Sequence, residues 1–93
     1  MENLETREIV SMVEGVLFAS GEPVAIERIC QAIGLDKDTA ERVLQQLADY
    51  YAYERRGIRL IRMDNQYQLV SAPEYGEIIR RAFEIRKPAK LSQ

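Results

Sequence analysis

The chain of 93 residues is 46% hydrophobic and 30% charged, which allows one globular domain with a modest core, and it has no apolar run long enough to cross a bilayer. It has no histidine, one cysteine and neither a phosphate-binding glycine-rich loop nor a calcium-binding loop, so we predict no catalytic, cofactor-binding or metal site, and no cofactor. The net charge is −2, but residues 1–54 carry −7 and residues 55–93 carry +5, which indicates either directional contacts or simply a solvated face on each half.

The first predicted helix covers residues 5–19. Its apolar side chains fill an arc of roughly 160° on a helical wheel, wider than the ~100° that a single core contact needs. Val10 and Met12 lie at the two ends of this arc, and Phe18 falls on the far side. Residues 20–23 end the helix, because glycine permits a positive φ and proline disfavours helix at the residue before it.

A second, short helix is predicted at about residues 25–33. Its apolar residues share one face, and Gly34 is well placed to end it in the left-handed conformation. Cys30 lies on the core face, where a small buried hydrophobic side chain is a better interpretation than a reactive thiol.

The third predicted helix begins after Asp36 as N-cap and runs to about Tyr53. Its apolar stripe faces the core, and a tyrosine cluster follows at its end. Core packing is favoured over a ligand site for Tyr50, Tyr51 and Tyr53, although Tyr53 points away from the stripe.

A β-hairpin is predicted next. Residues 58–60 and 67–69 alternate apolar and polar side chains, and Asp64 and Asn65 form the turn because both tolerate left-handed backbone. A hairpin of two strands is not stable alone, so its apolar side chains should face the helices. A fourth helix opens at Pro73 and runs to about Ile85, again with an apolar arc of roughly 160°.

This order of elements predicts a mainly α fold with a small β-hairpin, a winged helix-turn-helix of three helices, a two-stranded wing and a C-terminal helix. The domain is expected at residues 1–86, with residues 87–93 as a basic linker toward a second winged-helix domain that is missing from this sequence. The predicted core consists of Val13, Leu17, Ile29, Ile33, Leu44, Leu47, Ile58, Leu60 and Leu69.

The wide apolar arcs of the first and fourth helices predict a homodimer. We expect each helix to bury one side in the core and to leave a flank for a partner. The alternative is that the fourth helix covers the first. The candidate interface residues are Val10, Met12, Phe18, Ile78, Phe83 and Ile85.

Winged helices often bind DNA through the third helix and the wing, so this function needs a test. The third helix starts with acidic residues, and the pI of about 5.2 is far below the ~9 typical of DNA-binding domains. We therefore expect no specific DNA binding. A basic wing could still make a weak nucleic-acid contact through Arg55, Arg56, Arg59 and Arg62.

Several short stretches resemble the segregation and condensation protein B family. Residues 17–24 (LFASGEPV) resemble the family's segment after the first helix. The order and spacing of GIRL at 57–60, YQL at 67–69 and PEY at 73–75 match its wing and exit helix, and KPAKLS at 87–92 resembles its linker. The resemblance covers nearly the entire chain. Ala25 departs from it, since the family often has a hydroxyl residue capping the second helix.

The resemblance implies a non-catalytic module of the bacterial chromosome condensation and segregation complex. Proteins of this family have two tandem winged helices, form homodimers and associate with a kleisin subunit, segregation and condensation protein A, and with the SMC ATPase. The implied location is the cytoplasm, at the nucleoid. The alternatives are a winged-helix transcriptional regulator and, more weakly, a small enzyme that uses surface carboxylates.

Overall fold

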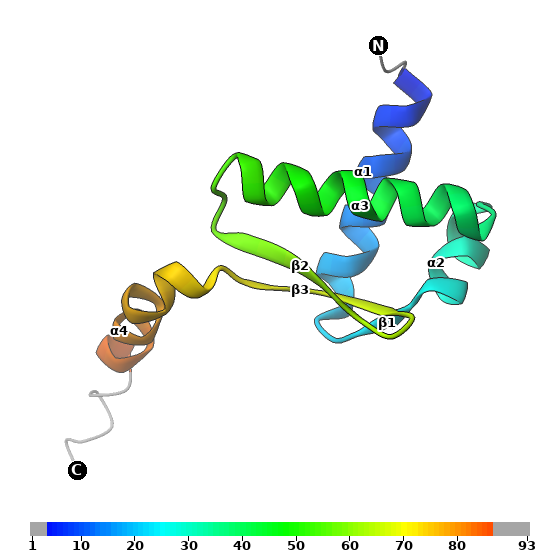
Figure 1. Ribbon diagram of the computed structural model, residues 1–93. Helices are drawn as coiled ribbons and strands as arrows, with labels where there is room; N and C mark the ends of the chain where they lie inside the picture. The colour runs from blue at the N-terminus through cyan, green and yellow to red at the C-terminus, as the bar shows by residue number, and fades with distance from the viewer. Residues whose placement is uncertain (1–3, 87–93) are drawn as a thin grey trace.

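The computed structural model describes residues 4–86, and the mainly helical fold predicted from the sequence is confirmed (Figure 1). None of the described helices is long and apolar enough to span a membrane. The predicted linker at residues 87–93 lies outside the described residues. In chain order the elements are α1 (Leu4–Ser20), β1 (Val24–Ala25), α2 (Ile26–Ile33), α3 (Lys37–Tyr53), β2 (Ile58–Met63), β3 (Gln66–Ser71), η1 (Pro73–Tyr75) and α4 (Gly76–Arg86).

The helix boundaries are fixed by the local signals that the sequence carries. Asp36 is the N-cap of α3, and its side chain accepts a hydrogen bond of 3.1 Å from the backbone N–H of Thr39. Hydrogen bonds from the Thr39 hydroxyl and backbone hold the pKa of Asp36 below its ordinary value. Gly34 ends α2 with φ of 87°, a left-handed conformation in which its N–H reaches the Cys30 carbonyl.

The sheet has three strands rather than the two that were predicted, because β1 joins the hairpin. The strand order is β1-β3-β2, all antiparallel, with Val24 opposite Tyr67 and Ala25 opposite Gln66. Ala25 therefore belongs to a strand and not to the second helix, and it caps α2 without a side-chain hydrogen bond. A two-residue strand has no periodicity of its own, so only its pairing with β3 defines it.

The core lies between α1, α2, α3 and the inner face of the sheet. Five of the nine predicted members are fully buried, while Ile33, Ile58, Leu60 and Leu69 are partly buried and pack against them. Cys30 is also partly buried against this core, as a small hydrophobic side chain would be. The buried cluster consists of Val13, Leu17, Val24, Ile26, Ile29, Ala40, Val43, Leu44, Leu47, Tyr51 and Tyr67.

Of the three tyrosines near the end of α3, only Tyr51 is in the core. Tyr51 is 2% exposed, and its hydroxyl donates a hydrogen bond to the Glu14 carboxylate of α1. Burial, and then this hydrogen bond, raise the pKa of Tyr51 above its ordinary value. The core packing predicted for Tyr50 and Tyr53 is wrong, since these side chains are 49% and 84% exposed.

The C-terminal helix differs most from expectation. The chain enters it through η1, and α4 then runs away from the body of the domain, far from α1 (Figure 1). Every described side chain of α4 is exposed except that of Ile79, which is half-buried, and none belongs to the buried cluster. The expectation that this helix buries one side in the core is therefore wrong, and so is the alternative that it covers the first helix.

Candidate protein interface

The C-terminal helix α4 carries a continuous apolar stripe whose two edges are largely exposed. At about 100° per residue, Ile78, Ala82, Ile79 and Phe83 follow one another across an arc of about 140°. At the two edges of this stripe, Ile78 is 61% exposed and Phe83 is 55% exposed. The side chain of Ile85, the third predicted interface residue on this helix, lies outside the described residues.

The opposite side of α4 is polar and held by ion pairs. The Arg80 guanidinium donates hydrogen bonds to the carboxylates of Glu77 and Glu84, one turn before and one turn after it. Such exposed pairs add only a few tenths of a kcal/mol each to a helix. An amphipathic helix of this kind is typical of one whose apolar face packs against another element, and among the described residues its main contact is with η1.

The predicted interface residues on α1 do not form one patch. Val10 packs against the margin of the core, whereas Met12 is 47% exposed and Phe18 80% exposed. Met12 and Phe18 are six positions apart, which places them about 120° apart around the helix. Each is therefore a separate exposed apolar group.

Two of the four predicted wing arginines are engaged within the fold. The Arg59 guanidinium forms an ion pair of 2.6 Å with Glu74 and donates to the Arg56 and Ile58 carbonyls. The Arg62 side chain donates to the Asp64 carbonyl, and its guanidinium lies 5.7 Å from the centre of the Tyr67 ring. These contacts hold the hairpin to its neighbours and reduce the positive charge available to a nucleic acid.

The surface of α3 that would read DNA is acidic. The carboxylate of its N-cap Asp36 accepts hydrogen bonds from Thr39. The carboxylate of Glu41, in the second turn, lies 3.9 Å from the Arg62 guanidinium. In the hollow between α3 and the wing, the Arg62 guanidinium thus already faces the Glu41 carboxylate. A phosphate backbone would meet little free positive charge there.

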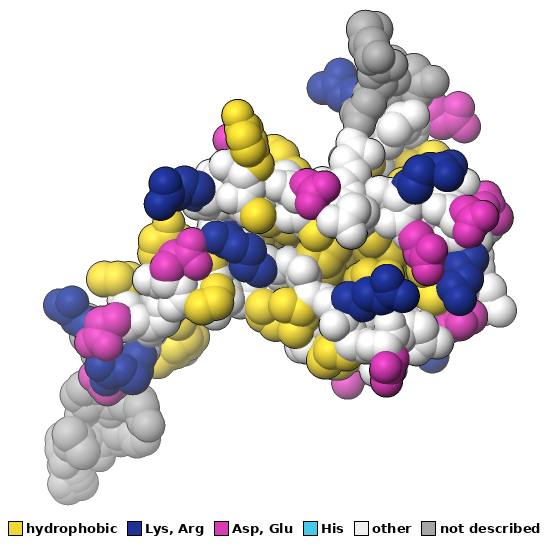
Figure 2. Space-filling model, in the orientation of Figure 1, with side chains coloured by type: hydrophobic (Ala, Val, Ile, Leu, Met, Phe, Trp, Pro, Cys, Tyr) yellow, Lys and Arg dark blue, Asp and Glu magenta, His cyan; other side chains and the backbone are white. Residues whose placement is uncertain are grey.

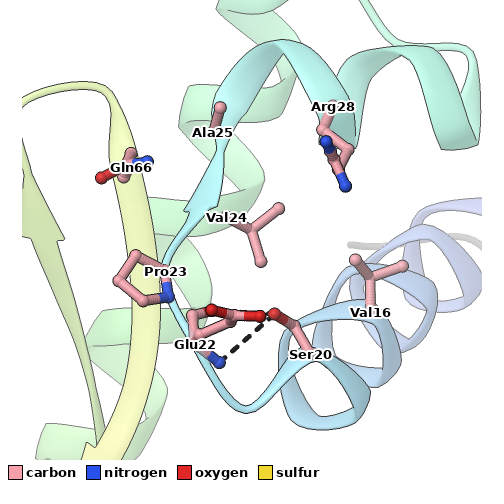
Figure 3. A pocket seen from close by; sticks show the side chains of 8 residues that line it. All are labelled: Val16, Ser20, Glu22, Pro23, Val24, Ala25, Arg28 and Gln66. Carbon is pink, nitrogen blue, oxygen red and sulfur yellow. Dashed lines mark hydrogen bonds between the residues drawn. The ribbon is translucent and has the colours of Figure 1, made fainter.

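A hollow beside the sheet has no acid–base or metal-binding arrangement among its lining residues. Figure 3 shows this hollow between the last turns of α1, the loop before α2 and β3, with Arg28 pointing toward Val16 and Ser20. The Ser20 hydroxyl is used in the local turn, where it donates to the Glu22 carbonyl at 2.9 Å. Among the described residues, no three Cys, Asp or Glu side chains are grouped as a metal site would require.

The sequence alone did not single out the tyrosines at the C-terminal end of α3 as a surface feature. Tyr53 is 84% exposed and Tyr50 49% exposed, and Arg55 and Arg56 follow directly in the turn to β2. The signal that could have found them is the combination of a tyrosine off the apolar stripe and two adjacent arginines at a helix end. Figure 2 shows a hydrophobic side chain and basic side chains gathered at this end of α3.

Comparison with known proteins gives one consistent result. A family model described as segregation and condensation complex subunit ScpB matches residues 11–93. Segregation and condensation protein B of Ruminiclostridium cellulolyticum is 33% identical over 90 residues, which cover 97% of this chain and 47% of that protein. The same protein of Acetivibrio thermocellus is 36% identical over 91 residues, which cover 97% of this chain and 46% of that protein. The chain thus spans about half the length of these relatives.

Two solved structures share the fold. One is a crystal structure of a dimer of the ScpB N-terminal domain complexed with an ScpA peptide, with a TM-score of 0.79 and 22% identity over 84% of this chain and 98% of that one. The other is ScpB from Mycobacterium tuberculosis, with a TM-score of 0.81 and 17% identity over 88% of this chain and 51% of that one. Both structures are similar to this chain in fold.

Proposed function

Because the chain belongs to the ScpB family of segregation and condensation complex subunits, we propose that it is a non-catalytic module of the SMC–kleisin complex that acts through homodimerisation and protein–protein contacts. The observation that carries this proposal is the exposure of Ile78 and Phe83 at the edges of the apolar stripe of α4. The proposed partners are a second copy, the kleisin subunit and the SMC ATPase. No cofactor, catalytic residue or membrane is assigned.

The short length of α4 favours a second copy as its packing partner. An isolated helix of 11 residues is marginal in water, because nucleation is costly and most helical stability in proteins comes from packing an apolar face. Within the described residues the main contact of α4 is with η1, and Ile78 and Phe83 stay largely exposed, so a surface from another chain would stabilise the stripe. Closed two-fold symmetry is the commonest way for identical chains to cover such patches.

The relatives support the same arrangement. The similar N-terminal domain described above is a dimer that is bound to an ScpA peptide. In this proposal the present chain contributes the corresponding winged-helix unit, residues 1–86, and residues 87–93 are a basic linker. Its place is at the nucleoid, where the SMC complex acts. The regulator alternative has less support, since Arg59 and Arg62 are engaged within the fold.

The test is the molar mass of the chain in solution at tens of micromolar, measured by light scattering. The wild type should have the mass of a dimer, and Phe83→Glu should shift it toward the monomer because the new carboxylate lies in the apolar stripe. Phe18→Glu tests the exposed phenylalanine of α1 in the same way. Gln31→Glu places the same charge on an exposed position of α2 and should leave the dimer unchanged.

A monomeric wild type would refute the homodimer. A dimer unaffected by Phe83→Glu and Phe18→Glu would remove these residues from its interface. Adding the kleisin subunit encoded in the same genome tests the second partner, since a complex of defined mass should form. Failure to form it would refute the kleisin contact.

A further inference from the structure

The end of α3 presents an aromatic and cationic surface that folding does not explain. We call the surface made by Tyr50, Tyr53, Arg55 and Arg56 the tyrosine–arginine corner. Tyr53 is the most exposed of the large apolar side chains described, at 84%, and Tyr50 is 49% exposed. Large aromatic side chains held in water gain little from folding, so their exposure together on one helix end indicates a contact with another molecule.

The backbone of this corner is firmly held. The N–H of Arg55 donates to the Ala52 carbonyl at 3.2 Å, and the N–H of Arg56 donates to the Tyr51 carbonyl at 3.0 Å. The Arg59 guanidinium, fixed by Glu74, donates to the Arg56 carbonyl at 2.6 Å. Arg55 takes a positive φ of 54°, which turns the chain sharply into β2. The corner is thus a rigid platform on an ordered element.

The side chains of this platform remain available. Neither Arg55 nor Arg56 uses its guanidinium in a hydrogen bond or ion pair among the described residues, in contrast to Arg59 beside them. The ring of Tyr50 lies 5.7 Å from that of the buried Tyr51, at an angle of 59°. Tyr50 is therefore braced by the core while its outer side faces solvent.

The chemistry of the corner fits an acidic polypeptide segment. Arginine presents a planar fork that binds carboxylates in pairs of hydrogen bonds, and tyrosine supplies a large contact area at a small entropic cost. Tyrosine and arginine are also the residue types that most often carry the binding energy of protein interfaces. A nucleic acid fits less well, because Glu54 stands between Tyr53 and Arg55 and the domain as a whole is acidic, with a net charge of −2.

We propose that the tyrosine–arginine corner docks an acidic segment of the kleisin subunit, whose carboxylates pair with Arg55 and Arg56 and whose apolar side chains pack on Tyr53. This inference rests on the proposed function, from which it takes the identity of the partner. The charge and the aromatic character of the segment follow from the corner itself.

The position of the corner connects it to the dimer. The N–H of Ala72 donates to the Gly57 carbonyl at 2.8 Å, and Arg59 is paired with Glu74, so the turn that carries the corner is tied to η1 at the root of α4. A segment docked on the corner would lie next to the helix proposed to form the dimer. Each dimer would then present two equivalent corners.

The experiment is calorimetric titration of the chain with the full kleisin subunit. The variants are Tyr53→Ala and the double change Arg55→Glu with Arg56→Glu. Each should weaken binding at least about tenfold, which corresponds to about 1.4 kcal/mol. Arg55→Lys with Arg56→Lys keeps the charge and should recover part of the affinity, and Arg28→Glu with Arg42→Glu is the matched reversal at exposed positions elsewhere. The affinity of the wild type should fall with salt, and that of the double glutamate variant should do so less steeply.

Thermal unfolding and molar mass of every variant show whether fold and dimer persist. Wild-type binding with unchanged affinity in both corner variants would overturn the proposal and leave the proposed function standing. Absence of wild-type binding would overturn the kleisin contact of the proposed function, and the docking proposal with it, but not the homodimer. Loss of kleisin affinity together with the dimer would also overturn direct docking. Direct docking of the kleisin would also be overturned if the double glutamate variant bound a labelled single-stranded oligonucleotide more weakly than wild type but bound the kleisin with unchanged affinity.

Discussion

Replacing Leu47 by alanine tests the packing of α3, on which the whole domain depends. Leu47 is 3% exposed and belongs to the buried cluster that joins α3 to α1 and α2. Removing three carbon atoms from a buried side chain loses about 2.4 kcal/mol of transfer free energy, at ~0.8 kcal/mol per methylene. The cavity that remains adds to this loss, so the total should be about 2–5 kcal/mol.

This loss is large relative to the stability that a domain of this size can have. At ~0.05–0.15 kcal/mol per residue, the free energy of unfolding should be roughly 5–14 kcal/mol. With an m value of about 1 kcal/mol per M in urea, the unfolding midpoint of Leu47→Ala should fall by about 2 M or more. Because a dimer couples stability to concentration, both proteins must be measured at one protein concentration.

Urea unfolding followed by circular dichroism is the appropriate assay. Gln45→Ala is the control, because Gln45 lies on the exposed side of the same helix, and its change should stay within about 0.5 kcal/mol. If Leu47→Ala also changed the free energy of unfolding by less than about 0.5 kcal/mol, the assigned phase of α3 would be refuted.

Three further predictions concern single groups and the absence of other ligands. Tyr51→Phe should destabilise the chain by about 1–3 kcal/mol in urea unfolding, because it leaves the partly buried Glu14 carboxylate without its donor; an unchanged midpoint would contradict the hydrogen bond. Asp36→Ala should lower the melting temperature at neutral pH. Because capping lowers the pKa of Asp36, the difference in melting temperature from wild type should persist above pH 3.8 and shrink as the pH falls through the folded-state pKa. A difference independent of pH would show that the carboxylate is not the cap. In an anisotropy assay at physiological salt, the purified chain should not bind a DNA duplex of defined sequence with sub-micromolar affinity. Elemental analysis should find no stoichiometric transition metal. Either binding would contradict the proposed function.

The sequence alone was sufficient for the features that depend on neighbouring residues. The cap at Asp36, the left-handed Gly34 and the turn at Asp64 were predicted and are present, because each depends on conformational preferences within a few residues. The alternation of side chains likewise predicted which face of the hairpin meets the helices. For the candidate site, periodicity identified Ile78 and Phe83 as apolar positions in excess of what the core requires.

Only the tertiary structure decided which of these side chains are used inside the domain. The strand at Val24–Ala25 exists because β3 lies beside it, and Tyr51 is buried while Tyr53 is not because the path of α3 over α1 covers one side of the helix end. The wing arginines were equivalent in the sequence, yet Arg59 is held by Glu74, 15 positions away, while Arg55 remains available. Such distinctions depend on contacts between residues distant in the chain, which no pattern of neighbouring residues encodes.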